Sequence, residues 1–182
     1  IEKIGDLWGV AASYNNIGII YYGKGDYEKA LEYYERSLGI NEKIGDLRGA
    51  AMSYNNIGLI YYEKGDYEKA LEYHERSLRV KEKIGDLRGV ASSYNNIGTI
   101  YYEKGDYEKA LENFQKSLEI GTQIGDIASI VEAQTSLSEV YVEKSEFEVA
   151  ERHLVEALQA CEQTGSKSGD FHAPFFNISE RT

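Results

Sequence analysis

The chain has 182 residues, with 31 acidic and 20 basic side chains and a formal net charge of -11. This length corresponds to about one domain, and the acidic balance excludes a broad surface for nucleic acid or for an anionic membrane. The single cysteine excludes an internal disulfide framework and a cysteine-rich zinc site. No apolar run approaches the ~20 residues that a membrane helix requires.

The sequence repeats with a period of 40 residues, which is the spacing between successive copies of Ile-Gly-Asp. These copies begin at Ile4, Ile44, Ile84 and Ile124. Residues 41–80 and 81–120 are identical at 30 of 40 positions. We therefore predict a repeat array over residues 1–164. Its four units are approximately 6–45, 46–85, 86–125 and 126–164.

Each unit is predicted to begin with one helix, which in the second unit runs from about Asp46 to Lys64. Asp46 is a favoured N-cap residue, and Gly45 before it suits a left-handed end of the preceding helix. Apolar side chains recur at spacings of four, three and four residues, which places them on one helical face. They are Ala50, Tyr54, Ile57 and Tyr61.

A second helix follows the break at Gly65, starts near Asp66 and ends near Ile84. Glu68 lies in its first turn, where the helix dipole favours an acid. No segment alternates as a strand would, so the chain is predicted to be all-α. A short helix pair cannot bury apolar faces on both of its helices alone, whereas stacked pairs can. We therefore predict an α-solenoid of tandem antiparallel helix hairpins.

Glycine recurs inside the first helices, although each such glycine costs about 1 kcal/mol relative to alanine. The positions are Gly9, Gly18, Gly49, Gly58, Gly89 and Gly98. We predict that close packing against neighbouring helices compensates for this cost.

The two ends of the chain depart from the repeat. Residues 1–5 match the end of a preceding second helix, so we expect a fragment of a longer array. Residues 165–182 are predicted to be a linker and a non-repeat tail. Three phenylalanines of this tail are expected to dock on the end of the fourth unit or in a groove, with a disordered tail as the alternative. They are Phe171, Phe175 and Phe176.

The repeated string Asn-Ile-Gly-x-x-Tyr, followed by Gly-Asp-Tyr-Glu-Lys-Ala-Leu-Glu, resembles the tetratricopeptide repeat. The matching positions in the second unit are Ile57, Gly58, Tyr61, Ala70, His74 and Ser77. The unit is longer than the usual ~34 residues and has no proline. This long form is similar to the repeats of Pins-type scaffolds, kinesin light chain and Rap-type regulators. The resemblance implies a right-handed superhelix whose first helices line a concave face that binds peptides or partner proteins.

Polar side chains share one face of each first helix, as the spacing of four, three and four residues in Arg88, Ser92, Asn95 and Thr99 shows. Asparagine lowers helix propensity, so the repeated Asn-Asn pairs call for a reason. The candidate peptide-binding residues are Asn15, Asn16, Tyr22, Arg48, Met52, Asn55, Asn56, Leu59, Tyr62, Arg88, Ser92, Asn95, Asn96, Thr99 and Tyr102.

Two interpretations of these residues remain open. Side-chain amides both donate and accept, so a ladder of them suits an extended peptide backbone, and the resemblance implies this role for Asn16, Asn56 and Asn96. Alternatively, the asparagines bond neighbouring helices. Arg48 and Arg88 are suited to binding a carboxylate through bidentate hydrogen bonds. Alternatively, they form ion pairs with nearby Asp or Glu side chains. The groove would be more apolar in its N-terminal half, and acidic at Glu132 and Glu139 in the other half.

The sequence contains no constellation of catalytic residues, and we predict no enzyme activity, no metal site and no cofactor. His74 replaces Tyr34 and Phe114 of the neighbouring units and is predicted to be a core residue, and Cys161 a small buried one.

The sequence thus predicts a cytoplasmic, non-enzymatic scaffold that binds a protein or peptide, and neither nucleic acid nor a membrane. The alternatives are a structural spacer or self-assembling array without a specific ligand, and a sensor domain of a larger signalling protein. Self-association would use the C-terminal tail or the exposed ends of the array.

Overall fold

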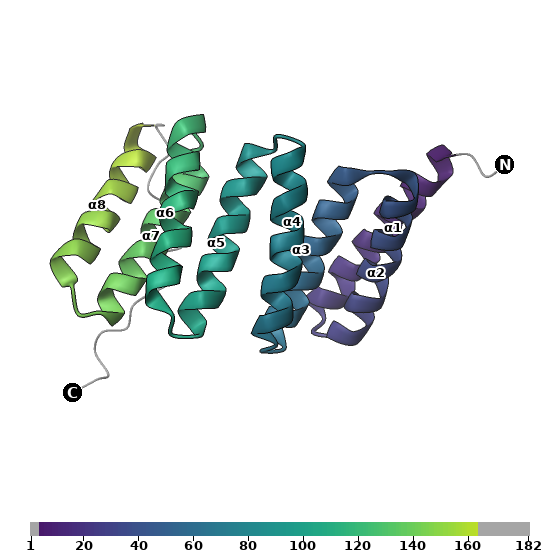
Figure 1. Cartoon of the computed structure of the whole chain (residues 1–182), viewed down its shortest axis with the longest axis horizontal. Coiled ribbons are helices and arrows are strands. Elements are labelled where there is room, and N and C mark those ends of the chain that lie inside the picture. Colours follow the sequence, from purple (N-terminus) through teal and green to yellow (C-terminus); the bar gives the residue numbers. More distant parts are fainter. Residues whose placement is uncertain (1–3, 164–182) are drawn as a thin grey trace.

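The computed structural model describes residues 4–163, which form eight helices and no strand, so the all-α prediction is confirmed. The helices are α1 (Ile4–Gly23), α2 (Tyr27–Ile44), α3 (Leu47–Glu63), α4 (Tyr67–Lys83), α5 (Leu87–Glu103), α6 (Tyr107–Ile124), α7 (Ile127–Glu143) and α8 (Phe147–Gln163). The helix pairs follow one another along the long axis of the array, from the N-terminal to the C-terminal end (Figure 1). The predictions for the tail phenylalanines lie outside the described residues.

The predicted caps and turns are present. The Asp46 carboxylate accepts a hydrogen bond from the Gly49 amide at 3.0 Å, and Asp66 begins α4 in the same way. Gly45 and Gly65 both have φ of +72°, a left-handed conformation that glycine adopts without a steric penalty. These local interactions end one helix and begin the next within about three residues.

The two helices of a unit pack closely at a glycine. A Cβ atom built on Gly98 would lie 2.6 Å from Cε1 of Phe114, and one on Gly58 would lie 2.9 Å from Cδ2 of His74. The predicted reason for these glycines is therefore confirmed. The other close approaches are at Gly18, Gly49 and Gly89. The prediction is wrong for Gly9, which has nothing within 4 Å because no helix pair precedes α1 in the described residues.

The row of helices has an inner and an outer layer. The first helices of neighbouring pairs contact each other, as α1 does with α3 and α5 with α7, whereas the second helices make no comparable contacts among the described residues. An array whose first helices approach more closely must bend toward them. The concave face is therefore built by α1, α3, α5 and α7.

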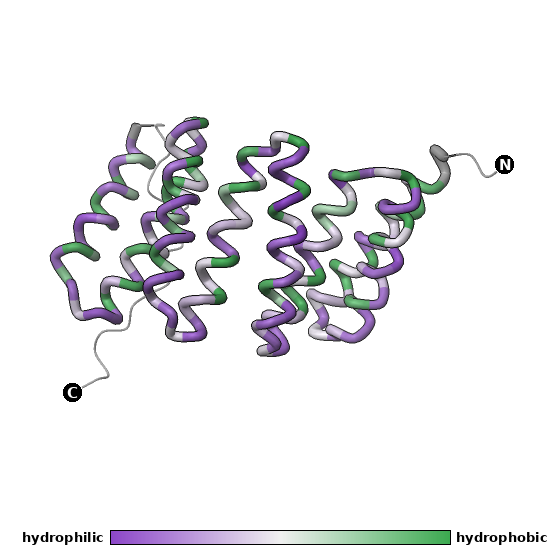
Figure 2. The backbone as a smooth tube through the Cα atoms, viewed as in Figure 1, coloured by the Kyte–Doolittle hydropathy of each residue, from purple (hydrophilic) through white to green (hydrophobic). Residues whose placement is uncertain are grey.

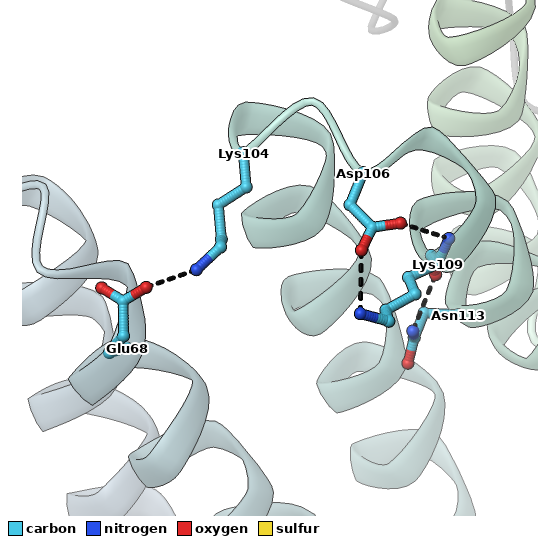
Figure 3. A network of polar contacts seen from close by, with 5 residues as sticks. All are labelled: Glu68, Lys104, Asp106, Lys109 and Asn113. Atoms are coloured by element: carbon cyan, nitrogen blue, oxygen red, sulfur yellow. Dashed lines mark hydrogen bonds and ion pairs between the residues drawn. The ribbon is translucent and has the colours of Figure 1, made fainter.

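Ion pairs join the hairpin turns of neighbouring units. Lys104, at the end of α5, pairs with Glu68 in the first turn of α4 (Figure 3). The same pair recurs between Lys64 and Glu28 at 2.8 Å. Each helix alternates between hydrophilic and hydrophobic residues, as expected for elements with one packed face (Figure 2). Exposed pairs of this kind contribute little to stability, so the apolar contacts between units hold the array together.

The ends of the array expose positions that its middle buries. Ile20 is 55% exposed, although the equivalent Ile60 is fully buried. Leu154 is 40% exposed, although the equivalent Phe114 is buried. Cys161 on α8 is half-buried, less than predicted, because no helix pair follows α8 in the described residues.

None of the helices in residues 4–163 is long and apolar enough to cross a membrane.

Candidate functional site

The predicted site residues all lie on α1, α3 and α5, the first helices that build the concave layer. They differ in exposure. Asn15 and Asn95 are buried, at 4% and 5% exposed, whereas Arg48 and Arg88 are exposed. The fold therefore brings the set onto one layer but turns part of it toward neighbouring helices.

The asparagines form hydrogen bonds from one unit to the next. Nδ2 of Asn56 donates to Oδ1 of Asn15 at 2.9 Å, and Nδ2 of Asn96 donates to Oδ1 of Asn55 at 3.2 Å. The first asparagine of one unit thus accepts from the second asparagine of the following unit. The contact with a neighbouring helix, one of the two sequence-based interpretations, is present. It uses one N–H group of each second asparagine.

The ladder ends at the fourth unit, where Ser136 stands in place of the second asparagine. Nδ2 of Asn95 donates instead to Oε1 of Glu132 at 2.9 Å. The buried Oδ1 of Asn95 has no hydrogen bond within the described part of the chain. The serine hydroxyl does not replace the longer amide, so the series of inter-unit bonds stops here.

The two arginines of the site are in different states. Arg88 pairs with the N-cap Asp126 of α7, at 2.7 Å between Nη2 and Oδ1. The equivalent pair of Arg48 with Asp86 is not formed, and Arg48 has no ion pair among the residues described. The Arg88 guanidinium is therefore partly neutralised by an ion pair within the protein, whereas the N–H groups of Arg48 are available to a ligand.

An open pocket of about 400 Å³ lies between the second and third units. Its lining comes from α3, from the C-terminal end of α4 and from the start of α5. The lining residues are Arg48, Ala51, Met52, Asn55, Lys81, Ile84, Asp86, Arg88, Gly89 and Ser92. Five of these are among the predicted site residues, so the pocket opens onto the same layer.

Lys81 is a pocket residue that the sequence analysis missed. It lies on α4, whereas the site residues predicted from the sequence all lie on the first helices. Its Nζ donates to Oγ of Ser93 at 2.8 Å, and partial burial lowers its pKa. The available signal was that Lys81 replaces Asn41 and Gly121 in otherwise very similar units.

The tyrosines of the site lie at the C-terminal ends of the first helices. The hydroxyl of Tyr22 donates to Oε1 of Glu63 at 3.0 Å, and partial burial together with this bond raises its pKa to about 12. Burial and the carboxylates of Glu143 and Glu139 raise the pKa of Tyr102 to about 12. These tyrosines remain neutral hydrogen-bonding groups at physiological pH.

The C-terminal half of the concave layer is acidic. Burial of the Glu132 carboxyl raises its pKa, and the hydrogen bond from Asn95 offsets part of this rise. Burial and the nearby Glu103 carboxylate raise the pKa of Glu139. The layer therefore runs from a cationic pocket between units two and three to carboxyl groups in unit four.

Among residues 4–163, no group of three or more His, Cys, Asp and Glu side chains is arranged to hold a metal ion. His74 is 3% exposed, and burial together with the Lys81 cation lowers its pKa to about 4. It is a neutral core residue, as predicted. The polar groups of this layer are suited to hydrogen bonding and to charge pairing.

The chain is similar to a known protein family and to solved structures. The family model described as Tetratricopeptide repeat matches residues 9–83 and 89–163. Similar solved structures include BtubC (BKLC) from P. vanneervenii, which is 23% identical with a TM-score of 0.76, over 94% of this chain and 71% of BtubC. The apo form of RapI is 20% identical with a TM-score of 0.77, over 86% of this chain and 57% of RapI.

Both neighbours are proteins with repeats of this type, which confirms the resemblance to kinesin light chain and to Rap-type regulators. At these identities the likeness to the solved structures shows the fold alone. A comparison with curated proteins gives no significant match.

Proposed function

Because the chain belongs to the tetratricopeptide repeat family, we propose that it is a non-enzymatic scaffold whose concave layer binds an extended segment of a partner protein. Repeats of this family generally mediate protein interactions, and its members are typically scaffolds without catalytic activity. The proposal adds to these family properties the place and the mode of binding.

The proposal rests on the side-chain amides of Asn56 and Asn96, which form only part of the hydrogen bonds that an amide can form. Each is held in place by one hydrogen bond to the preceding unit. The second N–H group and the carbonyl oxygen of each amide have no hydrogen bond within the described residues, and both side chains are half-exposed. The backbone of an extended peptide offers a C=O group that accepts a hydrogen bond and an N–H group that donates one. These are the two partners that each amide lacks within the described residues.

The inter-unit bonds support binding as well as stability. A side chain that is already fixed loses little rotamer entropy when a ligand arrives, so more of its hydrogen-bond energy contributes to affinity. The bond from Asn56 to Asn15 therefore orients Asn56 in advance. In this respect the two interpretations of the asparagines are compatible.

The test begins with selection of binding peptides for the full chain from a display library of random dodecapeptides. Affinities of a selected peptide are then compared for Asn56→Ala, Asn96→Ala and the control Asn113→Ala by fluorescence polarisation. Asn113 lies on the outer helix α6, where its Nδ2 donates to the Lys109 carbonyl oxygen. Loss of one net hydrogen bond of about 0.5–1.5 kcal/mol weakens binding by about two- to thirteen-fold.

Thermal melts of the same variants separate binding from stability. We expect the control to bind as the unsubstituted chain does, and the groove variants to bind more weakly at nearly the same melting temperature. Equal affinities for all three variants, or a library that yields no binding peptide, would contradict peptide binding by the asparagines.

A second candidate function, a spacer that associates end to end, has an observation of its own. Ile20 on α1 is exposed at a position that the other units bury, and Val10 is exposed where Ala50 and Val90 are buried. Leu154 and Leu158 on α8 are exposed as well. Contact between these two ends would continue the row of units. Analytical ultracentrifugation of the full chain tests this function, because end-to-end association produces species that lengthen with concentration and that Leu154→Glu suppresses.

A further inference from the structure

The three junctions between units differ at one position of the second helix, although the sequences around it are nearly the same. This position holds Asn41 in the first unit, Lys81 in the second and Gly121 in the third. Asn41 Nδ2 bonds the hydroxyls of Ser37 and Ser53, both at 3.4 Å. Only the middle junction therefore places a cationic side chain between the helices.

The size of this side chain accounts for the pocket. A Cβ atom on Gly121 would lie 3.0 Å from Cβ of Ser129, so the small residue lets α6 and α7 approach closely. In the middle junction the longer lysine occupies this space, and α3 and α5 contact each other less than α1 and α3 or α5 and α7 do. The pocket of about 400 Å³ lies at this wider junction.

The cations of the pocket have unused donors. The Lys81 ammonium has three N–H donors and one partner among the described residues, the Ser93 hydroxyl at 2.8 Å. The Arg48 guanidinium has no ion pair in the part of the chain that the structure describes. Arg88, by contrast, is held by Asp126. A partly buried cation without a full set of partners gains free energy when an anion reaches it.

The local charge balance of the pocket is positive. The pocket contains Arg48, Lys81 and one carboxylate, Asp86, whose Oδ1 accepts from the Gly89 amide at 3.0 Å. Arg88 is balanced by Asp126, so the remaining groups carry one net positive charge. This excess occurs in a chain whose formal net charge is -11. A site with this net positive charge attracts an anion.

We propose that the pocket between the second and third units binds a carboxylate side chain, Asp or Glu, of the partner segment, with Arg48 and Lys81 as its two donors. The planar Arg48 guanidinium matches a carboxylate with two parallel N–H groups. Met52 and Ile84 line the pocket as well and contact the methylene groups of the incoming side chain. The proposal rests on the proposed function, because it assigns one subsite of the same concave layer and the acidic character of its ligand.

The test uses small probes, so that its outcome does not depend on an unknown peptide. The full chain labelled with ¹⁵N is titrated with N-acetyl-glutamate amide, with N-acetyl-glutamine amide as the uncharged control of the same shape, and with N-acetyl-phosphoserine amide. Backbone amide shifts of Gly89 and Ser92, which line the pocket, report binding. We expect a saturable shift with the glutamate probe and none with the glutamine probe.

The chain itself supplies the variants. Lys81→Asn introduces the residue that the first unit already tolerates, and Arg48→Ala introduces the alanine that stands at the equivalent Ala128. Each should weaken the glutamate probe at least about ten-fold, equivalent to 1.4 kcal/mol. Lys109→Ala on the outer helix should leave its affinity unchanged. Circular dichroism verifies that each variant folds, and Lys81→Arg, which keeps the charge, should retain binding.

Several outcomes overturn the proposal. These are equal shifts with the glutamate and glutamine probes, no saturable shift at a probe concentration of about 50 mM, or unchanged affinity in both Arg48→Ala and Lys81→Asn. Tighter binding of the phosphoserine probe than of the glutamate probe overturns the choice of a carboxylate. The asparagine variants and the library test the proposed function separately, since the probes occupy the pocket without any peptide.

Discussion

The close approach between α5 and α6 allows a quantitative test with Gly98→Ala. The added Cβ atom would lie 2.6 Å from Cε1 and 2.7 Å from Cδ1 of Phe114, both inside van der Waals contact. The ring is 2% exposed and packs with Ala110, Leu137 and Val140, so it has no free space to move into. Overpacking a core in this way typically costs about 1–3 kcal/mol.

Gly9→Ala is the matched control, because Gly9 also lies inside a first helix but has nothing within 4 Å of the added atom. Both substitutions gain about 1 kcal/mol of helix propensity. Subtracting one change in the free energy of unfolding from the other removes this shared gain. The difference of about 1–3 kcal/mol is then the steric effect at Gly98 alone.

Urea unfolding followed by circular dichroism measures both variants, with the m-value checked for constancy. We expect Gly9→Ala to be more stable than the unsubstituted chain and Gly98→Ala to fall below Gly9→Ala by the difference above. If Gly98→Ala gains as much stability as Gly9→Ala, the explanation of the repeated glycines by close packing fails.

The fourth unit indicates how the clash is relieved. Ser138 and Leu154 stand there in place of Gly98 and Phe114, which pairs a larger first-helix residue with a smaller partner. Phe114→Leu should therefore be less harmful in the Gly98→Ala background than alone. The expected coupling energy in this double-mutant cycle is about 0.5–3 kcal/mol, and additive effects would contradict a direct contact.

Three further predictions concern single residues. Burial and the Lys81 cation lower the pKa of His74 from 6.5 to about 4, so the unfolded chain takes up a proton at a higher pH than the folded chain does. The contribution of His74 to the free energy of unfolding should therefore fall by about 3 kcal/mol as the pH drops from 6.5 to about 4. His74→Phe should remove this contribution, measured as the difference between the two chains in urea titrations across that pH range. Ser136→Asn should donate to the unsatisfied Oδ1 of Asn95 and stabilise the fold by about 0.5–1.5 kcal/mol, measured as a higher urea midpoint. Ser145 has φ of 61° where the other units have glycine, so Ser145→Gly should also stabilise by about 1 kcal/mol, and an unchanged midpoint would contradict the predicted strain.

The sequence by itself determined the helices and their pairing. Asp46 and Asp66 act on amides three residues away, and Gly65 ends a turn through its own backbone conformation. Such interactions depend only on nearby residues, so a repeated string produces a repeated structure. The apolar spacing, at 40-residue intervals, then requires neighbouring pairs to stack.

The tertiary structure alone decided which polar groups remain available for a ligand. Asn56 and Asn16 have the same neighbours in the sequence, but only Asn56 has a preceding unit to bond within the described residues. Arg48 and Arg88 likewise share their surroundings in the sequence, yet only Arg88 reaches an aspartate of the next unit.

These differences arise between units, where a change of one side chain alters the distance between two helices. A glycine at position 121 closes its junction, and Lys81 opens the equivalent one. Sequence spacing specifies which face of a helix a residue occupies, but not how far away the facing helix lies. That distance depends on the volumes of the side chains that meet there, and it decides whether a charged group pairs internally or lines an open pocket.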